Sequence, residues 1–473
     1  MSAEGEMRAG RLGGIVAMAR QALLSSDDRG KARRASIIAL FIRVANAVLA
    51  YGTQVVLARL MGQFEYGIFA FTWVWLLVFQ AIGTFGFGDS PVRFVPALRE
   101  KGSEAELRGF LRFAFIMSFL TPIAVAALFA LAVTQAGPWI ESAYVYPLLL
   151  MAAVIPFFCL QAYLEDIGRA YFWTVAGLVP VYILRHGFLL VFMLAAVAVG
   201  FEANAVTAFA CTLLGTALAA LWQLVAIWRR LRKVVPPGPR AYRIREWMVG
   251  SAPFAVMQGM FHLFSFMSVI VLSFFVGPAQ IALFFAATRI MQVVSFIPFA
   301  AAVGSAHLFS AAHAAQDQPR LTILTREVSL LTFLASTAAT AGVLLLGGWL
   351  LALFGEGFAA GYSVLAILAV GVIVRALFGP AEDILNMTGY GYFSAKTYVA
   401  MVLVNAALNV ALIIPFGIVG AALATTISVT LRSLWLARAA KRLLGLDTTV
   451  VGALIFAREF VARWRGTSAQ PAE

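Results

Sequence analysis

Charged residues are scarce in this sequence. Asp, Glu, Lys and Arg make up 12% of its 473 residues, whereas a soluble globular protein carries about a quarter. Hydrophobic residues account for 62% and are spread along the whole chain rather than collected in one anchor. This composition excludes a water-soluble domain, a disordered chain and a fibrous protein, and it predicts an integral membrane protein.

Cysteine and reactive motifs are rare as well. The two cysteines, Cys159 and Cys211, lie within apolar runs, and the sequence has no CxxC motif and no Cys/His cluster. We therefore expect no disulfide framework, no metal site and no cofactor. The sequence also lacks a nucleotide-binding loop and a catalytic triad. A chain of this kind is not expected to be an enzyme or to have catalytic residues.

Apolar runs long enough to cross the hydrocarbon as a helix occur about twelve times. The first six lie near residues 36–59, 68–88, 109–133, 144–163, 172–199 and 204–228. The second six lie near residues 249–276, 280–303, 323–346, 361–380, 394–414 and 418–440. The connections are short, which predicts an all-α integral membrane fold without a separate soluble domain.

The distribution of basic residues predicts the orientation. The net charge is +13, and the Lys and Arg residues concentrate in the terminal segments and in every second loop. The other loops hold Glu65, Glu141, Glu202 and Glu356 and essentially no base apart from Arg59. By the positive-inside rule both termini lie in the cytoplasm. The same rule accounts for the positive charge without a nucleic-acid partner.

The two halves of the chain resemble each other. Residues 56–70 align without a gap with residues 271–285 at a shift of 215, and Leu-Glu-Asp-Ile at 164–167 echoes Ala-Glu-Asp-Ile at 381–384. Because a six-span unit is even, both copies have the same orientation. This predicts two six-helix lobes related by a parallel internal repeat, with a central cavity and the substrate path between them.

The repeat divides the chain into five predicted parts. They are a basic, amphipathic cytoplasmic N-terminus (1–35), an N-terminal six-helix lobe (36–228), a basic cytoplasmic linker (229–248), a C-terminal six-helix lobe (249–440) and an amphipathic or disordered cytoplasmic tail (441–473).

Four stretches carry a resemblance to a known family. They are LARLMGQFEYGIFAF, FGFGDSPVRFVPAL, ALFFAATRIMQVVSFIPFA, and LFGEGFAAGYSVLAILAVG followed by FGIVGAALATTIS. In order and spacing the chain resembles the polysaccharide-biosynthesis (Wzx-type) flippases of the multidrug/oligosaccharidyl-lipid/polysaccharide exporter superfamily. The resemblance implies a cavity that opens alternately to each side of the bacterial inner membrane. It also implies a polyprenyl-pyrophosphate-linked oligosaccharide as cargo and polysaccharide polymerase or assembly proteins as partners.

Four arginines lie inside predicted spans without an acidic counterpart at the same depth: Arg43, Arg185, Arg289 and Arg375. A charge at the bilayer centre costs at least a few kcal/mol, so we expect each of these arginines to have a partner or a function. Guanidinium groups suit a pyrophosphate because they are forked donors that stay charged. The alternatives are that Arg43 snorkels to the interface and that Arg375 pairs with Glu382 or Asp383.

Polar stripes on two spans point to the same cavity. Arg43, Asn46 and Gln54 share one helical face, and Gln258, His262 and Ser265 share another. These are candidate substrate-binding residues, although hydrogen bonding between helices would also explain them. Two acidic pairs, Glu165-Asp166 and Glu382-Asp383, are gate candidates at matching cytoplasmic ends. Constitutive surface salt bridges would explain them equally well.

Other functions remain open at this point. A cation-coupled multidrug exporter of the same superfamily needs acids within its lobes, and the middle of these spans has none. A membrane-embedded glycan polymerase or ligase would carry a large periplasmic loop. The longest candidate loop, near 347–360, has only Glu356 among charged residues. A lipid II flippase, by the same resemblance, usually has two further helices that residues 441–473 cannot supply.

Overall fold

The computed structural model describes residues 28–454, which are almost entirely helical and contain no strand. In the first half the helices are α2 (Asp28–Gly83), α3 (Pro91–Glu100), α4 (Glu104–Gln135), α5 (Ser142–Ala170), α6 (Thr174–Val179), η2 (Pro180–Leu184), α7 (Arg185–Ala198) and α8 (Ala205–Val234). In the second half they are α9 (Ile244–Leu272), α10 (Pro278–Val294), α11 (Phe296–Ala314), α12 (Gln318–Ala352), η3 (Phe358–Gly361), α13 (Tyr362–Leu377), α14 (Ala381–Met387) and α15 (Gly391–Leu444).

Two of these helices each cross the membrane twice. The 56 residues of α2 would measure about 84 Å if straight, against about 30 Å of hydrocarbon. The backbone reverses at Gly62, where φ is +71°, a value that favours glycine. The Tyr66 hydroxyl therefore donates to Gln54 Oε1 at 2.9 Å, although the two residues are 12 apart in sequence. Gly417, with φ of +55°, reverses α15 in the same way.

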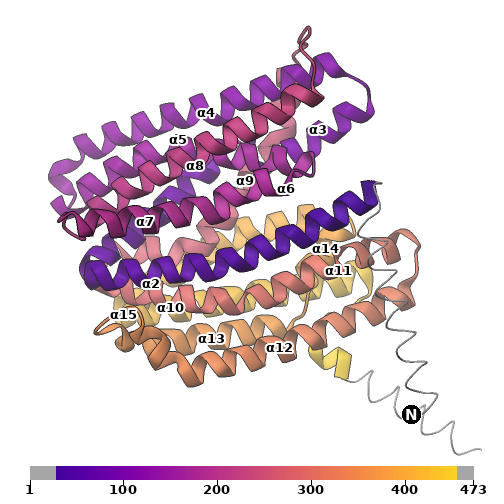
Figure 1. The fold of residues 1–473 in the computed structure, drawn as a ribbon. Helices are drawn as coiled ribbons and strands as arrows, with labels where there is room; N and C mark the ends of the chain where they lie inside the picture. The colour runs from indigo at the N-terminus through magenta and orange to yellow at the C-terminus, as the bar shows by residue number, and fades with distance from the viewer. Residues whose placement is uncertain (1–27, 455–473) are drawn as a thin grey trace, which may run out of the picture.

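Ten helices in the described range are long and apolar enough to cross a membrane. Because α2 and α15 each cross twice, these helices make twelve passes, which confirms the predicted count. An even number of passes places both described chain ends on one face, which we call the terminal face; it lies toward the right in Figure 1. The turns at Gly62 and Gly417 lie on the opposite face, which we call the far face.

The helices form two six-span lobes. In the N-terminal lobe α5 is the central helix and packs against α2, α4 and α8. In the C-terminal lobe α15 packs against α9, α13 and α14. Figure 1 shows α2 running between the two groups of helices. The lobes meet mainly where α2 contacts α9 and α10, which are the repeat equivalents of its own two halves.

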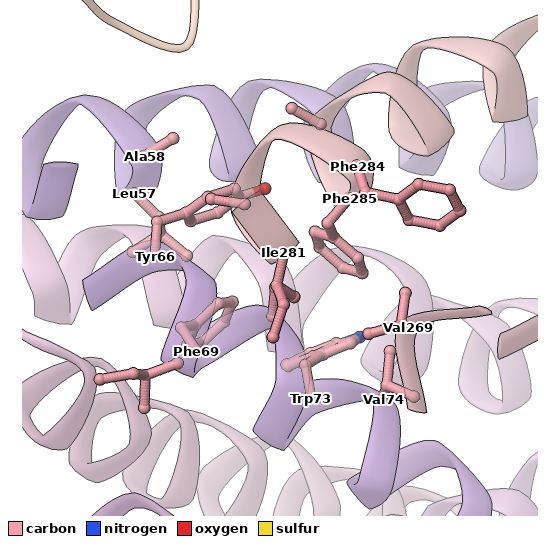
Figure 2. Packing of buried hydrophobic residues seen from close by; sticks show 14 of the residues in the cluster. Leu57, Ala58, Tyr66, Phe69, Trp73, Val74, Val269, Ile281, Phe284 and Phe285 are labelled. Atoms are coloured by element: carbon pink, nitrogen blue, oxygen red, sulfur yellow. The ribbon is translucent and has the colours of Figure 1, made fainter. Parts of the chain in front are cut away.

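An aromatic core closes the interface on its far-face side. Figure 2 shows Tyr66 and Phe69 of α2 beside Ile281 and Phe285 of α10. Tyr66 is fully buried, and its ring centroid lies 6.1 Å from that of Phe285 and 6.3 Å from that of Phe354 in the other lobe. The two lobes are therefore joined by well-packed apolar surface at this depth.

Polar contacts reinforce this closure at the membrane surface. Arg59 Nε donates to the Leu353 carbonyl at 2.5 Å, and Gln63 Nε2 donates to the Glu356 carbonyl at 3.0 Å. Both bonds join the Gly62 turn to the loop after α12. Arg59, the one base outside the predicted positive-inside pattern, thus has a structural partner in the opposite lobe.

Hydrogen bonds and an ion pair attach the segment between the lobes to the N-terminal lobe. Arg108 donates to the carbonyls of Pro239 at 2.9 Å and Pro236 at 3.1 Å, and Arg243 pairs with Glu106 at 2.7 Å. These contacts fall within the predicted linker, 229–248. The predicted N-terminal segment, 1–35, lies mostly outside the described residues, as does the tail beyond residue 454.

Helix α9 belongs to both lobes. Near its start, Trp247 is 1% exposed and packs edge-on against Phe110 of α4. Near its end, the hydroxyl of Ser268 lies 2.7 Å from that of Thr425 in α15. Pro253 interrupts the hydrogen-bond ladder between these two anchors. Helix α9 therefore connects the two lobes, with a proline between its two contact regions.

Candidate functional site: polar cavities between and within the lobes

A cavity of about 190 Å³ lies between the lobes, on the terminal side of the aromatic core. We call it the arginine cavity. Its polar lining residues are Asn46, Tyr51 and Gln54 of α2, Arg185 and His186 of α7, and Arg289 and Gln292 of α10. One guanidinium therefore comes from each lobe. Four of the predicted binding residues meet here.

Within the described residues, neither guanidinium of the arginine cavity forms an ion pair. Arg289 Nη1 donates to Gln292 at 2.7 Å, and Arg185 Nη1 lies 3.5 Å from the Gln161 amide oxygen. Among the described residues, Arg289 Nε and Nη2 and Arg185 Nε are buried and have no hydrogen-bond partner. Within residues 28–454 no carboxylate lies within 4.0 Å of either group. An arginine remains charged in proteins, so the cavity presents two positive charges that an anion would satisfy.

Aromatic rings support both guanidinium groups. Arg289 Cζ lies 4.2 Å from the centroid of Phe285, and Arg185 Cζ lies 4.2 Å from that of Phe158. Such cation–π contacts contribute about 0.5–2 kcal/mol each. They hold the planes in place without occupying all the N–H donors.

A second cavity, of about 230 Å³, lies closer to the terminal face. We call it the terminal cavity. Its ionisable and polar lining residues are Arg43, Gln80, Thr84, Asp89, Glu165, Asp166, Arg169, Tyr182, Gln258 and His262. Arg43 lies between the lobes, with Cζ at 5.3 Å from the ring of Tyr182 and 5.1 Å from that of Phe299. Its guanidinium is thus inside the protein rather than directed toward lipid.

Each acid of the terminal cavity has its own hydrogen-bond or ion-pair partner. The Tyr182 hydroxyl donates to Glu165 at 3.1 Å, and Asp166 pairs with Arg169 at 2.9 Å. Gln258 Nε2 donates to Asp89 at 2.9 Å across the lobe interface. Asp89 lies in the turn between α2 and α3, where burial raises its pKa despite the Gln258 hydrogen bond and nearby Arg169.

A third cavity, of about 60 Å³, lies inside the C-terminal lobe and is lined by Arg375, Glu382, Asp383 and Arg432. Arg432 Nη2 pairs with Glu382 at 2.5 Å, and its Cζ lies 3.8 Å from the ring of Tyr398. Burial alone would raise the pKa of Glu382, but Arg432 and Arg375 hold it below its ordinary value. Burial and the Glu382 charge raise the pKa of Asp383 to about 6.

The predicted site residues therefore fall into three groups. Asn46, Gln54, Arg185 and Arg289 line the arginine cavity; Arg43, Glu165, Asp166, Gln258 and His262 line the terminal cavity; Arg375, Glu382 and Asp383 line the C-terminal-lobe cavity. A wider space of about 510 Å³ includes Asp166 and Arg169 of one lobe and Glu382 and Tyr398 of the other. One member of each gate-candidate pair, Asp166 and Glu382, thus lines a common opening between the lobes.

Sequence reasoning missed five residues of these sites: Asp89, Arg169, Tyr182, Tyr398 and Arg432. A signal for two of them was present. The shift of 217 that relates Glu165 to Glu382 is nearly the shift of 216 that relates Tyr182 to Tyr398. Arg432 gave no such signal, because an arginine near a span end is most simply explained as an interfacial anchor.

Two six-span lobes, joined at one face and enclosing polar cavities, define a membrane transporter fold. The chain belongs to the polysaccharide biosynthesis protein family, whose profile matches residues 32–306. This confirms the resemblance inferred from the sequence.

Individual proteins are similar to this chain in sequence or in fold. A probable flippase, AglR of Haloferax volcanii, is 32% identical over 183 residues, which cover 37% of this chain and 38% of that protein. The match thus spans less than half of the relative. An inward-facing multidrug resistance MATE transporter of the MOP superfamily superposes with a TM-score of 0.68 at 15% identity, covering 86% of this chain and 99% of that one. The lipid II flippase MurJ in an inward closed conformation gives 0.64 at 15% identity, covering 86% and 87%.

Proposed function

We propose that this protein is a flippase for a polyprenyl-pyrophosphate-linked oligosaccharide, acting by alternating access in the bacterial inner membrane for surface polysaccharide biosynthesis. One observation carries the proposal: Arg185 and Arg289, from opposite lobes, line one cavity with unpartnered N–H donors, and in residues 28–454 neither forms an ion pair. Two uncompensated charges at this depth are costly. A pyrophosphate bound by both would offset that cost with charge-assisted, forked hydrogen bonds.

The arrangement of the cavities supports a route for the cargo. The basic residues of the sequence favour a cytoplasmic terminal face, and the terminal cavity lies on that side of the arginine cavity. The far-face side is sealed by the Tyr66 core and by the Arg59 and Gln63 contacts. A glycan would enter from the cytoplasm with its lipid tail in the bilayer between the lobes. Rocking about α9 would then open the far face.

The test uses the full-length protein in liposomes with a synthetic short-chain polyprenyl-pyrophosphate-linked disaccharide. Exposure of the sugar to an impermeant glycosidase reports transport. Arg43→Ala and Arg289→Ala should reduce transport at normal expression. We expect Arg289→Ala to cost at least tenfold, because a hydrogen bond to a charged group contributes about 1.5–3 kcal/mol.

Arg320→Ala is the matched control, since Arg320 is an exposed base at the start of α12. It should transport at the wild-type rate. A polyprenyl disaccharide lacking the pyrophosphate should be a poor substrate for every variant. Full transport by Arg43→Ala and Arg289→Ala together would refute the proposal.

A cation-coupled exporter of the same superfamily is the second candidate. The acids that line the terminal cavity, Asp89, Glu165 and Asp166, favour it. The two candidates differ in what Arg289→Ala does. An exporter of cationic drugs would keep or improve its drug transport when a positive charge leaves the cavity, whereas the flippase would lose activity.

A further inference from the structure

A separate groove lies on the outer side of the C-terminal lobe, between the two antiparallel halves of α15. Its volume is about 520 Å³. The nine residues that line it are Phe393, Met401, Leu431, Leu434, Trp435, Arg438, Ala439, Arg442 and Leu443. None of them lines the three cavities of the candidate site or the opening between the lobes.

Most of this groove is apolar and accessible from outside. Leu431 is 40% exposed, Trp435 41% and Leu443 43%. The ring of Trp435 stands nearly perpendicular to that of Phe393, with centroids 6.4 Å apart. Surface of this kind in a membrane helix suits a hydrocarbon chain. An exposed tryptophan is typical of the membrane–water interface.

Two basic residues stand at one end of the groove. Arg438 and Arg442 are one helical turn apart and therefore share a face of α15. Both are exposed, and in the described part of the chain neither has an ion pair. Neighbouring Lys441 instead lies 3.9 Å from Asp447. Arg438 is six residues from the helix end at Leu444, or about 9 Å along the axis.

We propose that this groove binds one anionic phospholipid in the leaflet at the terminal face. An acyl chain lies along Leu431, Leu434 and Met401, and the phosphate is held by Arg438 and Arg442. Charge complementarity selects this occupant, because basic pockets between membrane helices recognise anionic headgroups. The proposal does not depend on the cargo or on flippase activity.

Binding can be measured on the purified full-length protein in a neutral detergent by native mass spectrometry, with dioleoyl-phosphatidylglycerol as the probe and dioleoyl-phosphatidylcholine as the neutral comparison. We expect preference for phosphatidylglycerol. The double variant Arg438→Gln/Arg442→Gln should weaken its binding about twenty- to thirtyfold, since each base near an anionic headgroup contributes about 1 kcal/mol.

The matched control is Arg229→Gln/Lys233→Gln, an exposed pair with the same spacing in the last turns of α8. It removes the same charge from the same face and should leave binding unchanged. An equal loss in both double variants would mean general charge attraction and would overturn the site.

A second variant tests the apolar part without changing charge. Leu434→Trp fills the groove and should reduce phosphatidylglycerol binding at least fivefold. Soluble glycerol 3-phosphate should not compete at millimolar concentration. Competition by glycerol 3-phosphate, or full binding by Leu434→Trp, would show that only a headgroup phosphate is recognised and would refute the lipid site.

Discussion

Each lobe contains a Glu-Asp pair, but the ion pair is formed by the aspartate in one lobe and by the glutamate in the other. In the N-terminal lobe Asp166 has the ion pair, with Arg169 at 2.9 Å. Glu165 has a hydrogen bond from Tyr182 and, among the residues described, no base within 4.0 Å. In the C-terminal lobe Glu382 has the ion pair, with Arg432 at 2.5 Å. There Asp383 is the member without one.

The source of the arginine explains the difference. Each lobe has a guanidinium over the repeat-equivalent tyrosine: Arg43 over Tyr182 and Arg432 over Tyr398. Arg432 comes from α15 of its own lobe and reaches the glutamate. Arg43 comes from the first half of α2 and also contacts Phe299 of the opposite lobe. The ring contacts of Arg432 thus stay within the C-terminal lobe, whereas those of Arg43 reach across the lobe interface.

The largest expected effect is on the C-terminal-lobe ion pair. Arg432→Gln leaves Glu382 without its base, and breaking a buried ion pair costs about 3–5 kcal/mol. The apparent melting temperature in detergent should fall strongly. Adding Glu382→Gln should recover part of the loss, because the uncompensated charge is then gone. An unchanged melting temperature in Arg432→Gln would show that the pair has no structural role.

The unpaired aspartate should give the C-terminal lobe a pH dependence. The pKa of Asp383 rises from 3.8 to about 6 in the fold, so the folded state binds its proton more tightly than the unfolded chain does. That contribution to stability is complete below about pH 4 and is lost as the pH rises through about 6.

Asp383→Asn should therefore be more stable than wild type at pH 8, by on the order of 2 kcal/mol. The difference should vanish near pH 4. Thermal unfolding of both proteins across this range measures it. Glu327→Gln, which changes an exposed acid of α12, is the control and should give parallel curves. A difference that grows toward low pH would contradict the assignment.

Arg43 offers the reverse case, a large functional effect with a small effect on stability. At the repeat shift of 215, Arg43 corresponds to Gln258, so Arg43→Gln gives both lobes the same residue. Loss of its cation–π contacts should cost about 1 kcal/mol or less of stability. Transport of the pyrophosphate-linked probe should fall about tenfold. A variant that transports normally but unfolds early would place Arg43 among the structural residues.

The sequence predicted the twelve passes because the length of an apolar run is set by the bilayer, not by neighbouring helices. It also identified Arg185 and Arg289, because an isolated charge in an apolar run is visible without a structure. It could not predict that Arg185 and Arg289 share one cavity while Arg43 and Arg375 each line a different one. Which faces of α2, α7 and α10 meet depends on the packing of both lobes.

Arg375 shows why helical spacing alone was insufficient. Pairing with Glu382 or Asp383, seven or eight residues on, assumes an unbroken helix. Helix α13 ends at Leu377, and Gly379 adopts φ of +66° before α14 begins. Arg375 still lines the same cavity as Glu382 and Asp383, but the ion pair of Glu382 is with Arg432, 50 residues away in the sequence. A contact between segments so far apart arises from tertiary packing, which a single sequence does not show.

Removing one hydroxyl from each lobe tests the comparison most directly. Tyr182→Phe removes the one hydroxyl bonded to Glu165, whereas Tyr398→Phe leaves Glu382 with Arg432. Each change keeps the ring beneath its arginine. We expect a loss of about 1–2 kcal/mol for Tyr182→Phe and about 0.5 kcal/mol for Tyr398→Phe. Thermal unfolding of the two variants side by side measures the ratio. Equal losses of stability would mean that the ion pair in the C-terminal lobe does not compensate for the missing hydroxyl. The two sites would then be equivalent, although Glu165 and Glu382 have different partners.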